Sequence, residues 1–415
     1  MKVLLVTLYF PPAGGGGVQR PLKLATHLPA FGIETHVLAP DDPKWVHRDD
    51  ELVPPSQAWV HRAHYVGPSG RRPADELHGT EGFERLATQV RLLGRRLLVP
   101  DENVSWNLTA IPAATRIVRD EGIDAVITTS PPNSIHLIGA AVKRMTGARW
   151  IADLRDSVAA HPHRRTESLA VRAKERTAAG VAQLVARNAD AIVAASEAIA
   201  EETRSLEPRA GVTMIPNGCD FDDFAGLEYR RGDRFRITHA GSFFGKRSPR
   251  PFLQALADSN LDVVARFLGD FRPADREWAE SLGLGDRLEL LPYASHRHAL
   301  ELQRESDALL LLIPEADGRG RGVLSGKVFE YLAAARPILA AVPPDGAAAE
   351  LIRDVGAGVV APPEDVGAIK DALAGLVQRW QAGSLNGQPL SEDDRERLDR
   401  RSRVREYADL LLNLP

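Results

Sequence analysis

The chain has 415 residues, enough for two domains of about 200 residues each. Its composition, 44% hydrophobic and 26% charged with a net charge of −4, is that of an ordinary soluble protein and gives no indication of nucleic-acid binding. The single cysteine, Cys219, excludes an internal disulfide framework and a cysteine-based zinc site. We therefore expect a protein of a reducing compartment, the cytoplasm.

The first apolar run, residues 2–8, predicts a β-strand. It is too short for a signal peptide, and prolines and glycines follow it where a cleavage site would be expected. The glycine run 14–17 comes next, and residues 18–28 predict a helix. A glycine-rich loop between a strand and a helix lets bare backbone N–H groups approach a phosphate or a sugar. The alternative, a flexible linker, rarely occurs nine residues into a chain between two such elements.

Further apolar runs predict the other strands of a first parallel sheet, at 34–39, 58–62, 124–129, 149–153, 190–195 and 212–215. Residues 84–98 predict a basic amphipathic helix. This helix either docks on anionic lipid, at the inner face of a membrane, or packs on its own domain with a solvated basic face. We favour the second interpretation, because a few arginines bind a membrane only weakly.

A second set of strands is predicted at 235–241, 263–269, 288–291, 308–313, 338–342 and 358–360. The strand 235–241 ends in a glycine and is followed by the basic pair Lys246 and Arg247 and then by a helix, an arrangement that predicts an anion site. A solvated basic turn is the alternative. The last segment, 400–412, predicts a helix.

The segment 308–342 reads as a strand, a loop, a helix over 326–335 and a second strand. Lys327 lies in the first turn of that helix, where a cation is unfavourable unless an anion is shared with it. Glu330 lies one turn further along the same face and can accept hydrogen bonds from a hydroxylated group. A surface Lys–Glu pair is the alternative. Because Arg247 supplies a second basic turn in the same domain, we favour a shared phosphate.

The sequence Lys327-x-Phe-Glu-Tyr-Leu-Ala-Ala-x-x-Pro-Ile338 resembles the donor-site signature of retaining glycosyltransferases of family four. The resemblance implies the GT-B architecture, an α/β fold of two Rossmann-like doubly wound domains that face a central cleft. It also implies that the lysine contacts the donor diphosphate and that Glu330 contacts the nucleotide ribose. The family often carries a glutamate eight positions before Glu330, to contact the donor sugar, and this chain has Gly322 there.

The resemblance extends over nearly the whole chain and implies three domain segments. Residues 1–216 form an acceptor-binding domain, 217–397 form a nucleotide-sugar-binding domain, and the terminal helix, about 398–415, packs back on the first domain. The donor set implied in this way comprises Gly15, Gly16, Arg247, Ser325, Lys327, Glu330 and Tyr293, with His296 near the base.

Acceptor contacts are implied for Gln19 in the glycine loop, and for Ser130 and Asn133 in the Thr-x-Pro-Pro segment. Asp156, in the Asp-Leu-Arg-Asp segment, can orient an acceptor hydroxyl or take its proton. Asp153 is expected to form a structural ion pair with Arg155. His161 and His163 are interpreted as solvated loop residues.

The predicted reaction is glycosyl transfer from a UDP- or GDP-linked sugar, with retention of configuration, and Asp156, Arg247 and Lys327 are the catalytic candidates. No Asp-x-Asp pair stands at a strand end, so we expect neither a metal nor a cofactor, and cationic side chains stabilise the leaving group. The acceptor is a small molecule or a lipid-linked saccharide. A nucleotide-sugar 2-epimerase and a non-catalytic sugar-nucleotide-binding relative remain as alternatives. The base, the sugar, the acceptor and the oligomeric state are left open by the sequence.

Overall fold

The structure, a computed structural model, describes residues 1–42, 47–68, 98–157, 169–243, 246–315, 320–385, 387 and 389–414. The chain forms two compact units, which are described separately below. Unit 1 holds Met1–Arg72, Glu76–Asn217 and Arg401–Pro415, and unit 2 holds Gly218–Arg400. The basic helix predicted over 84–98, apart from its last residue, and both His161 and His163 lie outside the described residues.

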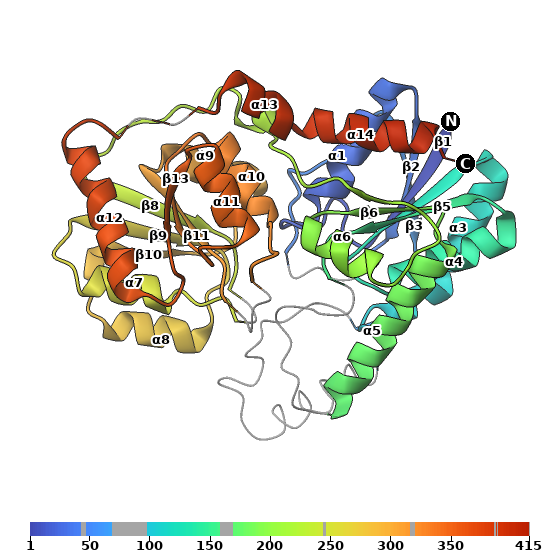
Figure 1. The fold of residues 1–415 in the computed structure, drawn as a ribbon, viewed down its shortest axis with the longest axis horizontal. Coiled ribbons are helices and arrows are strands. Elements are labelled where there is room, and N and C mark those ends of the chain that lie inside the picture. The colour runs from blue at the N-terminus through green and yellow to red at the C-terminus, as the bar shows by residue number, and fades with distance from the viewer. Residues whose placement is uncertain are drawn as a thin grey trace. The chain divides into compact units, whose positions relative to one another are not determined.

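Unit 1 contains a parallel sheet of seven strands in the order β3-β2-β1-β4-β5-β6-β7 (Figure 1). The strands are β1 (Lys2–Thr7), β2 (Glu34–Pro40), β3 (Ala58–Ala63), β4 (Ala125–Thr129), β5 (Arg149–Leu154), β6 (Ala191–Ala194) and β7 (Val212–Met214). Side chains alternate between the two faces of β1, so that Val3 and Leu5 join one buried cluster and Leu4 and Val6 another. Both faces are covered, which explains the unbroken apolar runs in the sequence.

The helices of unit 1 are α1 (Gln19–His27), α3 (Asn107–Glu121), α4 (Ile135–Thr146), α5 (Leu169–Asn188), α6 (Glu197–Arg204) and α14 (Arg400–Leu412). The terminal helix α14 contributes Val404, Tyr407 and Leu411 to the same cluster as Val3 and Leu5 of β1. The end of the chain therefore completes the core of unit 1.

Unit 2 contains a second parallel sheet, of six strands in the order β10-β9-β8-β11-β12-β13. Its strands are β8 (Phe235–Ala240), β9 (Val263–Leu268), β10 (Leu288–Leu291), β11 (Ala308–Leu312), β12 (Ile338–Ala341) and β13 (Gly358–Ala361). Its helices are α7 (Arg250–Ala257), α8 (Pro273–Ser281), α9 (His296–Glu305), α10 (Gly326–Ala333), α11 (Ala347–Asp354), α12 (Val366–Gln381) and α13 (Glu392–Leu398). Two buried clusters, one on each face, again enclose this sheet.

Each sheet reverses its strand order once, between β1 and β4 in unit 1 and between β8 and β11 in unit 2. In open parallel sheets, ligands bind beyond the carboxyl ends of the strands at such a reversal. The predicted α/β class with two doubly wound sheets is confirmed. No helix in the described part of the chain has the length and apolarity needed to span a bilayer.

Helix α9 begins at His296, where no helix was predicted from the sequence. The hydroxyl of Ser295 accepts a hydrogen bond from the backbone N–H of His298, which caps the helix. The prediction missed this cap because Pro292 and the polar residues after it are equally typical of a loop. The difference matters because it gives His296 a fixed place beside α10.

The packing of α4 on β5 gives a first prediction. A Cβ atom on Gly139 would lie 2.1 Å from Nε1 of Trp150, whose side chain is fully buried. Gly139→Ala should therefore lower the free energy of unfolding by about 1–3 kcal/mol, the usual cost of overpacking a core. Urea denaturation measures this. The matched control is Gly180→Ala in α5, where the new methyl group meets nothing within 4 Å and should raise stability by about 0.5–1 kcal/mol. Equal midpoints for wild type and Gly139→Ala would contradict the packing.

Candidate functional site

The first candidate site lies at the carboxyl end of β8 in unit 2. Gly241 follows this strand with φ +140°, and a Cβ atom on it would lie 1.6 Å from the Lys327 ammonium nitrogen. The ammonium group thus occupies the space that a side chain at position 241 would need. It donates a hydrogen bond of 2.5 Å to the carbonyl oxygen of Ala240. The first turn of α10 and the end of β8 are therefore held together by the predicted phosphate-binding lysine.

A second contact joins the same two elements. The hydroxyl of Tyr331, on α10, accepts a hydrogen bond of 2.9 Å from the backbone N–H of Ala240. Tyr331 is fully buried, and burial raises the pKa of its hydroxyl above its ordinary value. This tyrosine remains neutral and fixes the helix start against the strand end, a role that the sequence analysis did not anticipate.

The structure brings Arg247 and Lys327 together. Burial lowers the pKa of Lys327 well below its ordinary value, and the charge of Arg247 lowers it further, against the opposing effect of Glu330. Arg247 is itself 7% exposed, and burial lowers the pKa of its guanidinium. The positive charge of Arg247, from the segment after β8, thus acts on the amine of Lys327 on α10. Such an arrangement is costly without a bound anion and becomes favourable with one.

His239, in β8, belongs to the same group and was missed by the sequence analysis. Its Nδ1 lies 2.9 Å from the carbonyl oxygen of Leu310, so Nδ1 carries the proton and donates it. Burial, together with the charges of Lys327 and Arg247, lowers the pKa of His239 well below its ordinary value. A histidine near the carboxyl end of a predicted strand was the available signal.

Glu330 is held in place from α9. Burial would raise the pKa of Glu330, but hydrogen bonds from His296 and Gln303 outweigh it and hold the pKa below its ordinary value. Nε2 of His296 lies 3.2 Å from one carboxylate oxygen, and the amide of Gln303 donates to the other. The carboxylate is thus ionised at neutral pH and fixed in orientation, as a group that accepts hydrogen bonds from hydroxyls should be.

Two other predicted donor residues lie in the segments around these groups. Ser325 is the N-cap residue of α10, and its enclosed hydroxyl has no partner among the described residues. Tyr293 is partly buried in the segment between β10 and α9. The predicted contact of Tyr293 with a nucleotide base stays a prediction.

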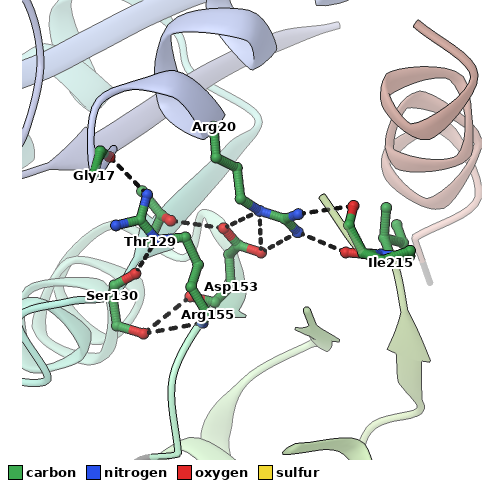
Figure 2. Close-up of polar contacts among 8 residues, drawn as sticks. Gly17, Arg20, Thr129, Ser130, Asp153, Arg155 and Ile215 are labelled. Carbon is green, nitrogen blue, oxygen red and sulfur yellow. Dashed lines mark hydrogen bonds and ion pairs between the residues drawn. The ribbon is translucent and has the colours of Figure 1, made fainter. Parts of the chain in front are cut away.

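The second candidate site lies at the carboxyl ends of β1, β4 and β5 in unit 1, and Figure 2 shows its contacts. Asp153 is fully buried and accepts hydrogen bonds from Arg20, at 2.7 and 3.0 Å, and from the hydroxyl of Thr129 at 2.6 Å. The Arg20 guanidinium also donates to the carbonyl oxygens of Ile215 and Pro216, at 3.0 and 3.1 Å. A buried pair that is also hydrogen-bonded in this way is structural.

This geometry corrects the predicted ion pair between Asp153 and Arg155. The structural role expected for Asp153 holds, but its partner is Arg20, because the first turn of α1 places that guanidinium directly over the end of β5. Arg155 turns elsewhere: it donates to the carbonyl oxygen of Gly17 at 2.7 Å and to that of Ser130. Sequence proximity favoured the wrong arginine.

The glycine loop leaves room for a ligand. A Cβ atom on Gly15 or Gly16 would meet nothing within 4 Å, and Gly15 has φ +88°. The amide nitrogen and oxygen of Gln19 are enclosed without a partner among the described residues. Both observations suit the predicted binding roles of these three residues, which remain predictions.

The other acceptor candidates differ in exposure. Ser130 is fully buried, and its hydroxyl donates to the carbonyl oxygen of Asp153 at 3.3 Å. Asn133 and Asp156 are partly exposed, and the charge of Asp156 acts on Arg155. Ser130 therefore shapes the site from within, whereas Asn133 and Asp156 lie nearer its surface.

Residues 15–218 match the sequence profile of the glycosyl transferase 4-like domain. Together with the fold, this match supports a glycosyltransferase of the family-four type. A comparison with curated proteins found no significant sequence match.

Solved structures share the fold over the whole chain. Sucrose-phosphate synthase from Thermosynechococcus elongatus has a TM-score of 0.69 at 17% identity, with 100% of this chain and 98% of that chain covered. HepE from Anabaena, in complex with UDP-glucose, has a TM-score of 0.65 at 14% identity, with both chains covered completely. UDP-GlcNAc 2-epimerase from Neisseria meningitidis, bound to UDP-GlcNAc, has a TM-score of 0.53 at 11% identity, with 99% of this chain and 100% of that chain covered. At these identities the likeness shows the two-domain α/β fold alone.

The buried lysine gives a prediction on stability. Lys327→Met should raise the free energy of unfolding of the ligand-free protein by about 1 kcal/mol at pH 7, because the buried amine and its repulsion by Arg247 are removed. The folded-state pKa of Lys327 lies below its unfolded value, so the lysine destabilises the protein most below the folded-state pKa. The gain should therefore shrink as pH rises toward about 10.4.

Urea denaturation at several pH values measures this effect. Lys370→Met, on α12, is the control and should change stability by less than about 0.5 kcal/mol. A loss of stability in Lys327→Met at pH 7 would contradict the electrostatic account.

Proposed function

We propose that this protein transfers a sugar from a UDP- or GDP-linked donor to an acceptor hydroxyl or similar nucleophile, with retention of anomeric configuration. The observation that carries the proposal is the pair of repelling cations, Lys327 and Arg247, at the strand-order reversal of unit 2. The complexes of HepE with UDP-glucose, UDP, and UDP with glucose support a nucleotide-sugar donor and a saccharide acceptor. The acceptor is a small molecule or a lipid-linked saccharide, in glycan or natural-product biosynthesis.

In this proposal unit 2 binds the donor. Lys327 and Arg247 bind the diphosphate, and the hydroxyl of Ser325 donates to it from the helix start. Glu330, oriented by α9, accepts hydrogen bonds from the ribose hydroxyls. Tyr293 contacts the base.

The leaving diphosphate is then stabilised by the two cations without a metal ion, since the cations lie where its charge develops. Unit 1 presents the acceptor, with Gly15, Gly16 and Gln19 on one side and Asn133 and Asp156 on the other. Asp156 orients the attacking hydroxyl, and an oxygen of the departing phosphate receives its proton. Retention follows when the acceptor attacks from the face that the phosphate leaves.

Donor binding can be tested with a thermal-shift panel of nucleoside diphosphates. A ligand at about 100 times its dissociation constant should stabilise the protein by about 2.7 kcal/mol, and only the matching base should do so. Glu330→Ala should abolish the shift because the ribose contact is lost. Glu350→Ala, an exposed glutamate on α11, is the control and should leave the shift intact. A full shift in Glu330→Ala would refute the ribose assignment.

Catalysis can be tested by incubating the matching nucleotide sugar with a panel of saccharides that begins with glucose. We expect the nucleoside diphosphate to be released only when an acceptor is present. NMR should show that the product has the anomeric configuration of the donor. The rate of transfer should fall by at least about 100-fold in Lys327→Met. Conversion of the donor sugar without an acceptor would indicate the epimerase instead. Binding with no turnover across the panel would indicate the non-catalytic alternative.

A further inference from the structure

Arg155 in unit 1 has a guanidinium nitrogen to which no described residue is hydrogen-bonded. Its Nε donates to the carbonyl oxygen of Ser130 and its Nη1 to that of Gly17, at 2.7 Å for the second bond. Its remaining nitrogen, Nη2, has no hydrogen-bond partner among the described residues, and Figure 2 shows no dashed line to it. Two N–H donors on a guanidinium whose position is already fixed are therefore available.

Among the described residues, no carboxylate forms an ion pair with Arg155. Asp153 is occupied by Arg20 and by the hydroxyl of Thr129. Asp156 acts on Arg155 through its charge, but no ion pair joins the two among the described residues. Burial lowers the pKa of Arg155, and the charges of Asp156 and Asp153 oppose this only in part, while the charge of Arg20 adds to it. An anion placed against Nη2 would favour the cation further.

The space beside this nitrogen is kept open by the glycine loop. A Cβ atom on Gly17 would lie 3.7 Å from Nη2 of Arg155 and 3.3 Å from the ring of Tyr9. Any larger side chain at position 17 would therefore crowd the guanidinium. Gly15 and Gly16, next in the same loop, have no neighbouring atoms on the side that a Cβ would occupy. The described residues therefore leave the Cβ side of Gly15 and Gly16 open, in the same loop that Arg155 contacts through Gly17.

We propose that Arg155 is a substrate-binding residue that holds a phosphoryl oxygen through Nη2 at the glycine loop of unit 1. A guanidinium matches the geometry and charge of a phosphoryl group, and the bare backbone of a glycine-rich loop suits the same ligand. The inference rests on the proposed function for the source of that group, which is either the donor diphosphate or a phosphorylated acceptor. Arg155 thus has a binding role in addition to holding the loop against Ser130.

The test is an isothermal titration of the full-length Lys327→Met variant with inorganic phosphate, since this background weakens the cationic site of unit 2. Adding Arg155→Gln should lower phosphate affinity about tenfold or more, as expected for loss of a charge-assisted hydrogen bond. Adding Arg155→Lys instead should keep part of the affinity, because the charge remains. Thermal unfolding of each variant shows whether the loop contacts to Gly17 and Ser130 are needed for folding. Glucose, which carries no charge, is the control ligand, and its affinity should be the same with and without Arg155→Gln.

UDP distinguishes the two sources of the phosphoryl group. If the donor supplies it, Arg155→Gln in the otherwise wild-type chain weakens UDP binding about tenfold or more, and phosphate does not bind the UDP-saturated protein. If the acceptor supplies it, UDP affinity is unchanged and phosphate binds alongside UDP. Either result supports the site.

Two results would overturn the inference. The first is that the Lys327→Met variant binds no detectable phosphate. The second is that Arg155→Gln leaves the phosphate affinity of that variant unchanged. Failure of the wild type to bind any nucleoside diphosphate would instead overturn the proposed function. The two failures are therefore separable.

Discussion

The candidate site of unit 2 is built around a lysine ammonium that occupies the space a side chain at position 241 would need. Gly241 has no Cβ, so Lys327 can reach across the end of β8 and bind the carbonyl oxygen of Ala240. This contact fixes the first turn of α10 over the strand-order reversal. The charge of Arg247 acts on Lys327, and burial lowers the pKa of both side chains. The fold thus maintains a concentration of positive charge that an anion would stabilise.

Unit 1 has a buried ion pair at the carboxyl ends of its central strands. Asp153 and Arg20 neutralise each other, and Arg20 also fixes the backbone at Ile215 and Pro216, just after the last strand of the sheet. Because Asp153 is occupied in this way, Arg155 donates instead to the carbonyl oxygens of Gly17 and Ser130, and its third nitrogen has no hydrogen-bond partner among the described residues. Both units therefore place cationic groups at the carboxyl ends of their central strands.

Solved structures of other proteins share the fold of this chain. Sucrose-phosphate synthase, HepE and an epimerase share two parallel sheets with this chain at 11–17% identity. One architecture therefore serves several reactions, and the side chains at the strand ends must decide among them. In our proposal those side chains include Lys327, Glu330 and Arg247, and Gly322 stands where the family-four signature often has a glutamate.

The sequence by itself determined the two parallel sheets and most of their strands, because strands buried on both faces appear as unbroken apolar runs. It also indicated Lys327, Glu330 and Arg247, since charged residues beside glycine turns are visible in a linear pattern. Only the tertiary structure decided the partners: Arg20 for Asp153, His296 and Gln303 for Glu330, and His239 beside the two cations. These pairs join residues that are far apart in the chain. Their proximity follows from strand order and helix packing, which local periodicity does not encode.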